Sequence, residues 1–302
     1  MRVARRVGIL AGVAVVVLGL TAHAQVFRSA VDMVSLGVTV TDRDGRFVTD
    51  LTADDFEISE DGAGQTVRLF ARGDAKPAPE MHVGLLFDSS GSMEEDIELS
   101  RSAAIKFLNA LPEAVDVTLV DFDTEVRVAR YGPADFPRLV ERIRRRKPDG
   151  YTAMHDAMGV YLDGAAGQDG RRIFVLYTDG LDTSSSMNFS ETLDLLKGSD
   201  VTMYAVGFLR SPTGGRTMEQ RMRLQQMTEA TGGLAFFPTG AKELDPAYDK
   251  VVAEIRAQYT IGYLSTNAKT DGSWRKVEVR LKRQGLKVRG RKGYYAPFRT
   301  RP

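Results

Sequence analysis

The chain has 302 residues, 43% of them hydrophobic, which is enough to bury one large domain and a smaller one. Its 41 lysine and arginine residues nearly balance 40 aspartate and glutamate residues, so it lacks the basic excess of a typical nucleic-acid-binding protein. The absence of cysteine excludes disulfides, thiolate metal sites and cysteine nucleophiles.

Residues 1–24 have the layout of a secretory signal peptide. Arg2, Arg5 and Arg6 precede an apolar run, and the small-residue end Ala22-His23-Ala24 follows it. The apolar run is short for a membrane span, although an uncleaved membrane anchor is the alternative. We therefore expect an exported protein, periplasmic or secreted, with cleavage after Ala24.

Residues 25–75 have the pattern of short β-strands. Apolar residues alternate with polar or small ones from Val34 to Val40, which predicts a half-buried strand. The sequence Asp42-Arg43-Asp44-Gly45 is typical of a hairpin turn, and strands are expected around 56–58 and 67–70. A Pro-rich segment at 75–80 then indicates a domain boundary.

Residues 81–258 alternate between strand and helix patterns. The continuous apolar run from His82 to Phe87 predicts a strand buried on both faces of a parallel sheet. Further strands are expected at 115–122, 125–129, 172–178, 201–207 and 234–237, and helices at 93–111, 134–145, 153–165, 190–197, 217–230 and 242–257. This order predicts an α/β domain with a doubly wound, mostly parallel sheet of Rossmann-like type.

The β pattern returns in residues 259–302, with strands expected at 259–264, 275–282 and 286–290. Because an isolated hairpin is only marginally stable, we expect this segment and residues 25–75 to pair into one small β-sandwich, with the α/β domain inserted between them.

The C-terminal segment is basic. It carries eleven Lys or Arg residues between Arg275 and Arg301 against the single acid Glu278. Alternation along exposed strands accounts for much of this charge. Contact with an anionic envelope surface is the alternative, and salt would weaken it.

Three polar loops follow or precede elements of the predicted α/β domain. They are Asp88-Ser89-Ser90-Gly91-Ser92, Asp149-Gly150-Tyr151-Thr152 and Thr178-Asp179-Gly180-Leu181-Asp182. Ligands of open α/β sheets bind outside the carboxyl ends of the strands, so these loops are expected to form one site. Their hydroxyls and carboxylates are all-oxygen ligands, which suit Mg²⁺ best, with Mn²⁺ and Ca²⁺ as alternatives.

The pattern Asp88-x-Ser90-x-Ser92, followed by Thr152 and by Asp179 within Thr-Asp-Gly, resembles the metal-ion-dependent adhesion site of von Willebrand factor A domains. The resemblance covers about residues 81–258. It implies that Ser90, Ser92 and Thr152 bind the metal directly through their hydroxyls, and that Asp88 and Asp179 act mainly through water.

Two further residues are secondary candidates. Asp182 is a candidate auxiliary ligand, with a turn residue as its alternative role. Tyr151 occupies a position where many family members have the second of two glycines before the threonine. Its side chain could narrow the ligand surface or contact a partner.

The flanks are similar to those of a group of exported bacterial proteins of the acidobacterial type. The similarity lies in Leu51-Thr52-Ala53-Asp54-Asp55-Phe56 with Glu60-Asp61-Gly62, and in Arg291-Lys292-Gly293-Tyr294-Tyr295. These motifs are less specific than the metal pattern.

We therefore expect a non-enzymatic binding module whose protein partner supplies an Asp or Glu carboxylate to the metal, with no role for nucleic acid. The alternatives are a metal-independent scaffold and a Mg²⁺-dependent hydrolase, although no phosphate-binding loop or nucleophile elbow is present.

Ser90 and Ser92 could instead cap the following helix. The run Arg144-Arg145-Arg146-Lys147 is expected to be a solvated helix end.

Overall fold

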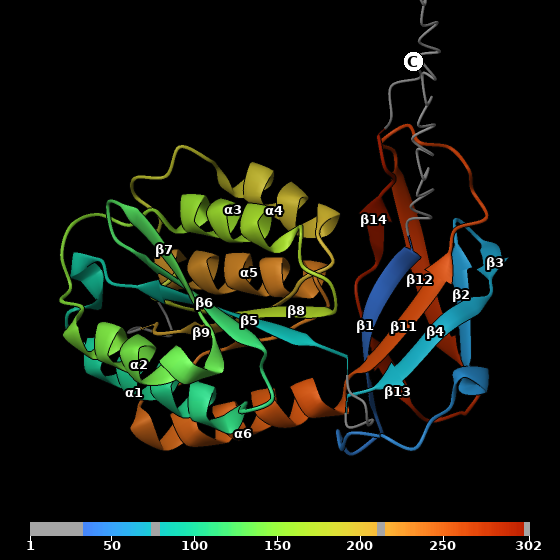
Figure 1. Ribbon diagram of the computed structural model, residues 1–302, viewed down its shortest axis with the longest axis horizontal. Helices are drawn as coiled ribbons and strands as arrows, with labels where there is room; N and C mark the ends of the chain where they lie inside the picture. The colour runs from blue at the N-terminus through green and yellow to red at the C-terminus, as the bar shows by residue number, and fades with distance from the viewer. Residues whose placement is uncertain (1–32, 74–78, 210–214, 299–302) are drawn as a thin grey trace, which may run out of the picture. The chain divides into compact units, whose positions relative to one another are not determined.

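The computed structural model describes residues 33–73, 79–209 and 215–298 (Figure 1). The expected signal peptide lies outside these residues, as does most of the Pro-rich segment. Within the described ranges, no helix is long and apolar enough to cross a membrane.

A six-stranded sheet forms the centre of the α/β domain, with the strand order β10-β9-β8-β5-β6-β7. The strands are β5 (Met81–Asp88), β6 (Asp116–Phe122), β7 (Val126–Tyr131), β8 (Arg171–Thr178), β9 (Thr202–Gly207) and β10 (Ala235–Phe236). Neighbouring strands are parallel except β7, which runs antiparallel to β6. All residues of β5 are buried, which explains its continuous apolar sequence. The doubly wound, mostly parallel sheet is confirmed.

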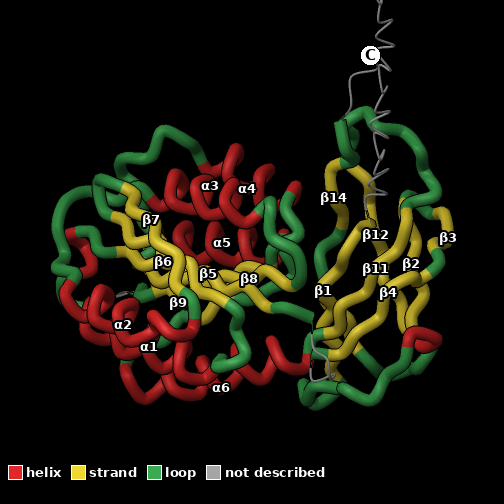
Figure 2. Tube along the Cα trace, in the orientation of Figure 1, coloured by secondary structure: helices red, strands yellow, loops and turns green. Residues whose placement is uncertain are grey.

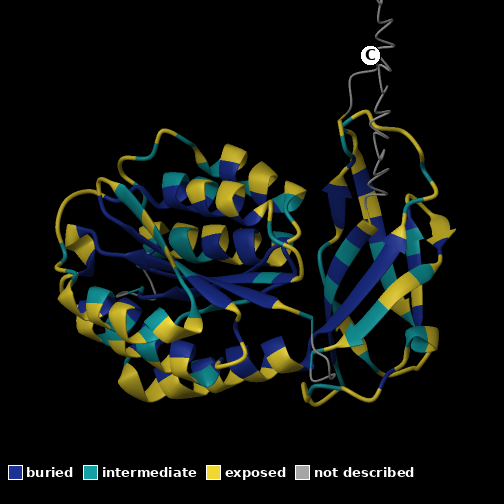
Figure 3. Ribbon diagram, in the orientation of Figure 1, coloured by how far each residue is buried: buried dark blue, intermediate teal, exposed yellow. Residues whose placement is uncertain are grey.

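Helices cover both faces of this sheet. They are α1 (Ile97–Ala110), α2 (Phe136–Arg145), α3 (Met154–Ala165), α4 (Phe189–Gly198), α5 (Gly215–Ala230) and α6 (Ala241–Ala257). Helices α1, α2 and α6 lie on one face, and α3, α4 and α5 lie on the other (Figures 1 and 2). Each helix buries one apolar side against the sheet, as the dark interior in Figure 3 shows.

The first helix begins later than the sequence predicts. Instead of starting at Met93, α1 starts at Ile97 and follows a short 3-10 turn, Gly91–Met93. The buried side chain of Met93 anchors this turn, and the Gly91 N–H donates to the Gly150 carbonyl at 3.1 Å. These contacts hold the chain in a loop before it can continue as a helix. Two more 3-10 turns, Ala53–Asp55 and Pro133–Asp135, lie elsewhere.

The two flanks form two four-stranded antiparallel sheets, ordered β13-β1-β11-β4 and β14-β12-β2-β3. The strands are β1 (Met33–Thr41), β2 (Phe56–Glu60), β3 (Ala63–Gln65), β4 (Val67–Arg72), β11 (Tyr259–Leu264), β12 (Trp274–Leu281), β13 (Lys287–Arg289) and β14 (Gly293–Tyr295). In both sheets the central pair joins one flank to the other, β1 with β11 and β2 with β12. The predicted pairing of the flanks is therefore confirmed.

Several basic residues of the C-terminal segment have partners within these sheets. Arg275 pairs with Glu60, and Arg280 pairs with Glu278. These contacts give part of the basic charge a structural role, in line with the strand-surface interpretation.

Candidate metal-binding site

The three polar loops meet at the carboxyl edge of the central sheet. The Asp149 N–H donates to the Ser89 carbonyl at 2.9 Å, which joins the second loop to the first. The Thr183 N–H donates to the Thr152 carbonyl at 2.9 Å, which joins the third loop to the second. The chain passes from β5 to β6 and from β8 to β9, in opposite directions along the sheet, and ligands of α/β sheets bind at such a switch point.

Asp88, the last residue of β5, lies at the centre of this edge and is 0% exposed. Its Oδ1 accepts a hydrogen bond from the Ser90 N–H at 2.9 Å, and its Oδ2 accepts one from the Thr178 hydroxyl at 2.6 Å. Both donors are neutral. Burial, together with the nearby charge of Asp179, raises the pKa of the Asp88 carboxyl to about 7.

Ser90 and Ser92 bring two hydroxyls together beside Asp88. Their Oγ atoms are 3.1 Å apart; Ser90 is fully buried, whereas Ser92 is exposed. Ser90 stands at the N-cap of the 3-10 turn, yet its side chain makes no capping hydrogen bond there. The N-cap of α1 is Asp96. The helix-capping explanation is therefore wrong for Ser90, whose hydroxyl pairs with that of Ser92 instead.

Thr152 belongs to the second loop and is almost completely buried. Its N–H donates to the Thr183 hydroxyl at 2.9 Å, and its carbonyl accepts from the Thr183 and Ser184 N–H groups. The third loop thus fixes the backbone of Thr152 from both sides. Asp179 is partly buried, and its Oδ1 accepts from the Leu181 N–H at 3.0 Å.

Asp182 and Asp156 stabilise the third loop and the residues after it through hydrogen bonds. Asp182 Oδ2 accepts from the His155 N–H at 2.9 Å and from the Ser185 hydroxyl at 2.6 Å. Asp156 accepts from the Ser186 and Met187 N–H groups at 2.9 and 3.0 Å. These hydrogen bonds favour the loop-building interpretation of Asp182 over the auxiliary-ligand one.

Tyr151 is 68% exposed beside this site. Its N–H donates to the Thr124 hydroxyl at 2.8 Å, which fixes the backbone and leaves the ring at the surface. The preceding residue, Gly150, has φ of +71°, and a Cβ there would lie 2.5 Å from the Thr124 hydroxyl oxygen. Glycine is therefore required at 150, whereas position 151 accommodates a side chain.

Arg146 supports the first loop, a role that the sequence did not reveal. Its Nε donates to the Ser89 hydroxyl at 3.0 Å, and its guanidinium also pairs with Asp123. The expectation of a solvated helix end is wrong for this residue, because α2 ends at Arg145 and extended backbone at Arg146 follows. The sequence signal is the pair Asp121 and Asp123, which alternation places on the same side of the strand.

Thr178 was also missed as a positioning residue, although it begins the third loop. Its hydroxyl donates to Asp88 and accepts from the Gly180 N–H at 3.0 Å. It therefore orients the central carboxylate from the neighbouring strand.

The residues that are brought together fit a hard divalent cation. The structure brings together three loops that carry hydroxyl and carboxylate side chains, next to the buried carboxylate of Asp88, and such a donor set suits Mg²⁺. In the parts of the chain that the structure describes, no three His, Asp or Glu side chains cluster as metal ligands.

Comparison with known proteins establishes the family. The profile of the von Willebrand factor type A domain matches residues 82–249, more than half of the chain. The chain belongs to this family. No curated protein sequence matches it.

Several solved structures are similar to this chain. The pilus adhesin SpaC from Lactobacillus rhamnosus GG has a TM-score of 0.50 at 12% identity, over 80% of this chain and 48% of that one. A von Willebrand factor type A protein from Catenulispora acidiphila has a TM-score of 0.48 at 14% identity, over 80% and 74%. A D319A mutant of the PilB minor pilin from Streptococcus sanguinis has a TM-score of 0.48 at 13% identity, over 59% of this chain and 62% of that one. The chain therefore matches less than two thirds of the length of that pilin.

Proposed function

We propose that this protein is an exported binding module that holds Mg²⁺ at the edge of its α/β domain and uses it to bind an acidic residue of a protein partner. Ser90, Ser92 and Thr152 are the proposed direct ligands. Asp88 and Asp179 would act mainly through water. Mn²⁺ or Ca²⁺ are alternative ions.

The observation that carries the proposal is the burial of Asp88 without a charged partner of opposite sign in its hydrogen bonds. A buried carboxylate is costly unless a cation compensates it. Here Asp179 adds a second negative charge. A divalent cation at the neighbouring hydroxyls would remove this penalty.

The same ligand set supports recognition of a carboxylate. Because the proposed direct ligands are neutral hydroxyls, a bound Mg²⁺ would keep most of its charge and supply an electrophilic centre for one more oxygen ligand. An Asp or Glu side chain of a partner provides such an oxygen. The pilus adhesin SpaC shares the fold, which agrees with a role in adhesion outside the cytoplasm, as does the signal-like segment at 1–24.

The arrangement favours binding over hydrolysis. The Ser90 Oγ is paired with the Ser92 Oγ and not with a histidine that could activate it. His82 Nδ1 pairs with Asp116 at 2.8 Å near the start of β5, whereas Ser90 follows the end of that strand. The buried ring of His155 packs against Phe189.

Metal binding tests the first half of the proposal. Titration calorimetry with Mg²⁺, Mn²⁺ and Ca²⁺ should give one saturable site in the wild-type protein and none in Asp88→Asn. Mg²⁺ at ten times its dissociation constant should stabilise the fold by about 1.4 kcal/mol, or ~2–4 °C. Asp163→Asn, on an exposed turn of α3, is the matched control and should bind metal normally.

Partner recognition is tested with a displayed peptide library. Peptides retained with Mg²⁺ but released by chelator should share a required Asp or Glu, and its replacement by Asn or Gln should abolish binding. Retention of the same peptides by Asp88→Asn or in chelator would instead establish a metal-independent scaffold. Turnover of phosphate esters or peptides that requires Mg²⁺ would establish the hydrolase alternative.

A further inference from the structure

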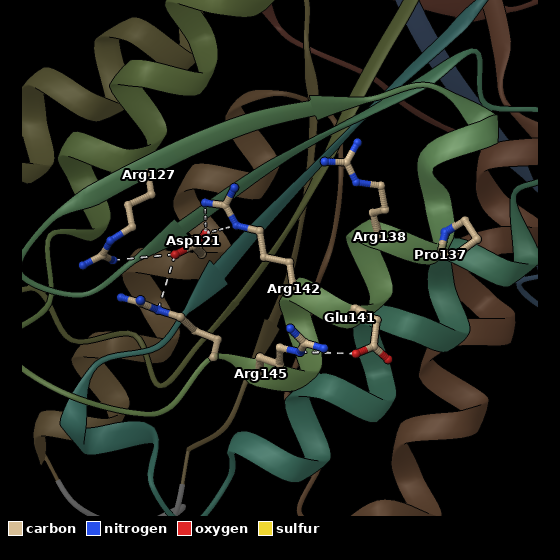
Figure 4. Close-up of a pocket in the computed structure, with 8 residues that line it drawn as sticks. Asp121, Arg127, Pro137, Arg138, Glu141, Arg142 and Arg145 are labelled. Atoms are coloured by element: carbon tan, nitrogen blue, oxygen red, sulfur yellow. Dashed lines mark hydrogen bonds and ion pairs between the residues drawn. The ribbon is translucent and has the colours of Figure 1, made fainter.

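A second candidate binding region lies beside α2, where a pocket of about 640 Å³ opens at the flank of the central sheet (Figure 4). Five arginines and two acids dominate its lining, which consists of Asp121, Arg127, Pro137, Arg138, Glu141, Arg142, Arg145 and Arg146.

The floor of the pocket is an ion-pair network of three arginines and two aspartates. Asp121 accepts two hydrogen bonds from Arg142, at 2.6 and 3.0 Å, and Arg127 and Arg146 lie 3.6 and 3.4 Å from its other oxygen. Arg127 and Arg146 also pair with Asp123. These contacts hold three guanidinium groups in fixed positions, which organises the floor before any ligand arrives.

The rim carries two arginines with spare donors. Arg138 and Arg145 have side chains that are 80% and 82% exposed. Arg138 pairs with Asp135 through Nη1 at 3.3 Å, and Arg145 pairs with Glu141 through Nε at 3.4 Å. The structure shows no acceptor among the described residues for the terminal nitrogens of Arg145. Each rim guanidinium can therefore present further N–H groups to a ligand.

Helix periodicity explains why three arginines of α2 line the same pocket. Arg138, Arg142 and Arg145 occupy positions i, i+4 and i+7 of α2, which lie on one side of a helix. The intervening Arg144 lines a different pocket, although it pairs with the same Glu141. The sequence thus places three guanidiniums toward one cavity and a chemically identical neighbour away from it.

We propose that this pocket binds a phosphate or sulfate group. Planar guanidinium forks match the geometry of oxyanions and donate charge-assisted hydrogen bonds to them. The cavity falls within the size range of small-molecule sites, so it has room for an ester of sugar size as well as for a free ion. Pro137 adds an apolar wall for the organic part of such an ester.

The proposed anion site is independent of the metal site. None of the proposed metal ligands lines the pocket. Arg146 links the two regions through its hydrogen bond to Ser89. Variants at the rim, Arg138 and Arg145, therefore test the pocket without disturbing the metal loop.

Calorimetry at low ionic strength and in chelator provides the test, with glucose 6-phosphate, inorganic phosphate and sulfate as probes. We expect saturable binding that weakens with salt. Arg138→Gln and Arg145→Gln should each weaken it by about five- to tenfold, and the double variant should abolish it. The matched control Arg144→Gln should bind like wild type. Asp88→Asn should also bind normally, which separates this site from metal binding.

The probes distinguish the source of the anion. Tighter binding of glucose 6-phosphate would assign the pocket to an ester, and equal binding of inorganic phosphate or sulfate would assign it to the free ion. Absence of saturable binding by all three probes would overturn the proposal. So would equal weakening by Arg144→Gln and Arg145→Gln, because it would reveal only general attraction to a basic surface.

Discussion

Two buried carboxylates, Asp88 in the α/β domain and Glu60 in the flanking β-sheets, have opposite environments. Asp88 receives hydrogen bonds from a backbone N–H and a threonine hydroxyl. Glu60 also lies out of solvent, but it accepts from the Arg275 guanidinium at 3.2 Å and from the Tyr263 and Tyr294 hydroxyls at 2.9 and 2.8 Å. Glu60 therefore has a cation, Arg275, among its hydrogen-bond donors, whereas the donors to Asp88 are neutral.

The difference shows that burial of a carboxylate is not by itself a mark of function. The interactions of Glu60 are complete within the fold, so its role is to join β2 to the C-terminal strands. Asp88 has a like charge, Asp179, nearby in place of a cation. An incomplete charge balance is therefore the better indicator of a site that acts on something outside the chain.

The largest expected effect is the loss of the internal cation in Arg275→Met. This change leaves Glu60 buried without its counter-charge, and should lower the free energy of unfolding by about 3–5 kcal/mol. Urea denaturation measures it. The adjacent Lys276→Met removes an exposed partner of Glu278 and should change stability by less than about 0.5 kcal/mol.

A double variant sharpens this result. Glu60→Gln with Arg275→Met removes both charges and should recover part of the loss, because the uncompensated carboxylate is gone. Equal stabilities of Arg275→Met and Lys276→Met would show that the Tyr263 and Tyr294 hydroxyls suffice for Glu60.

Removal of the charge of Asp88 should stabilise the protein, whereas Arg275→Met should destabilise it. Its pKa is raised from 3.8 to about 7, so its favourable contribution is fully present below about pH 4 and is lost as pH rises through about 7. In chelator at pH 8, Asp88→Asn should therefore be more stable than wild type by a few kcal/mol, with the difference vanishing near pH 4. Urea denaturation at several pH values tests this, and saturating Mg²⁺ should remove the wild-type deficit.

Glu60→Gln is the matched comparison for that experiment. It replaces a carboxylate that has a cation, and should destabilise the protein at pH 8. If Asp88→Asn and Glu60→Gln changed the free energy of unfolding in the same direction, the proposed difference between the two buried carboxylates would be wrong.

Much of the fold could be predicted because local patterns carry it. The run from His82 to Phe87 indicates a doubly buried strand, and alternation from Val34 to Val40 indicates a one-sided strand. The strands β3 and β14 were missed, because neither Ala63–Gln65 nor Gly293–Tyr295 shows an alternation of apolar and polar residues. Their pairing partners, not their own sequences, determine them.

The candidate site divides in the same way. The loops after β5 and β8 are visible in sequence because each follows an apolar strand. The supporting contacts are not visible in the sequence, because they join distant parts of the chain. Arg146 contacts Ser89, 57 positions away, and Arg275 contacts Glu60, 215 positions away. Such partners depend on the tertiary fold, which local pattern does not encode.

Loss of the support beneath the loop Asp88–Ser92 should have an intermediate effect. Arg146→Gln removes the charged contact to Asp123 and weakens the hold on Ser89. Residues that orient a metal loop typically affect metal affinity by about 10–100-fold, so calorimetry should show Mg²⁺ affinity falling in this range. The neighbouring Arg144→Gln should leave it unchanged. Normal Mg²⁺ affinity in Arg146→Gln would limit this arginine to stabilising β6 and α2.

The smallest expected effect on the fold is that of Tyr151→Gly, which would restore the glycine that many family members have before the threonine. The ring is 68% exposed, so the free energy of unfolding should change by no more than about 0.5 kcal/mol, and Mg²⁺ affinity should be unchanged. Binding of the Mg²⁺-dependent peptides should change instead, because this exposed residue directly precedes the proposed ligand Thr152. Weaker binding would identify Tyr151 as a partner contact, and stronger binding would show that its ring narrows the surface. Unchanged binding of every such peptide would exclude both roles.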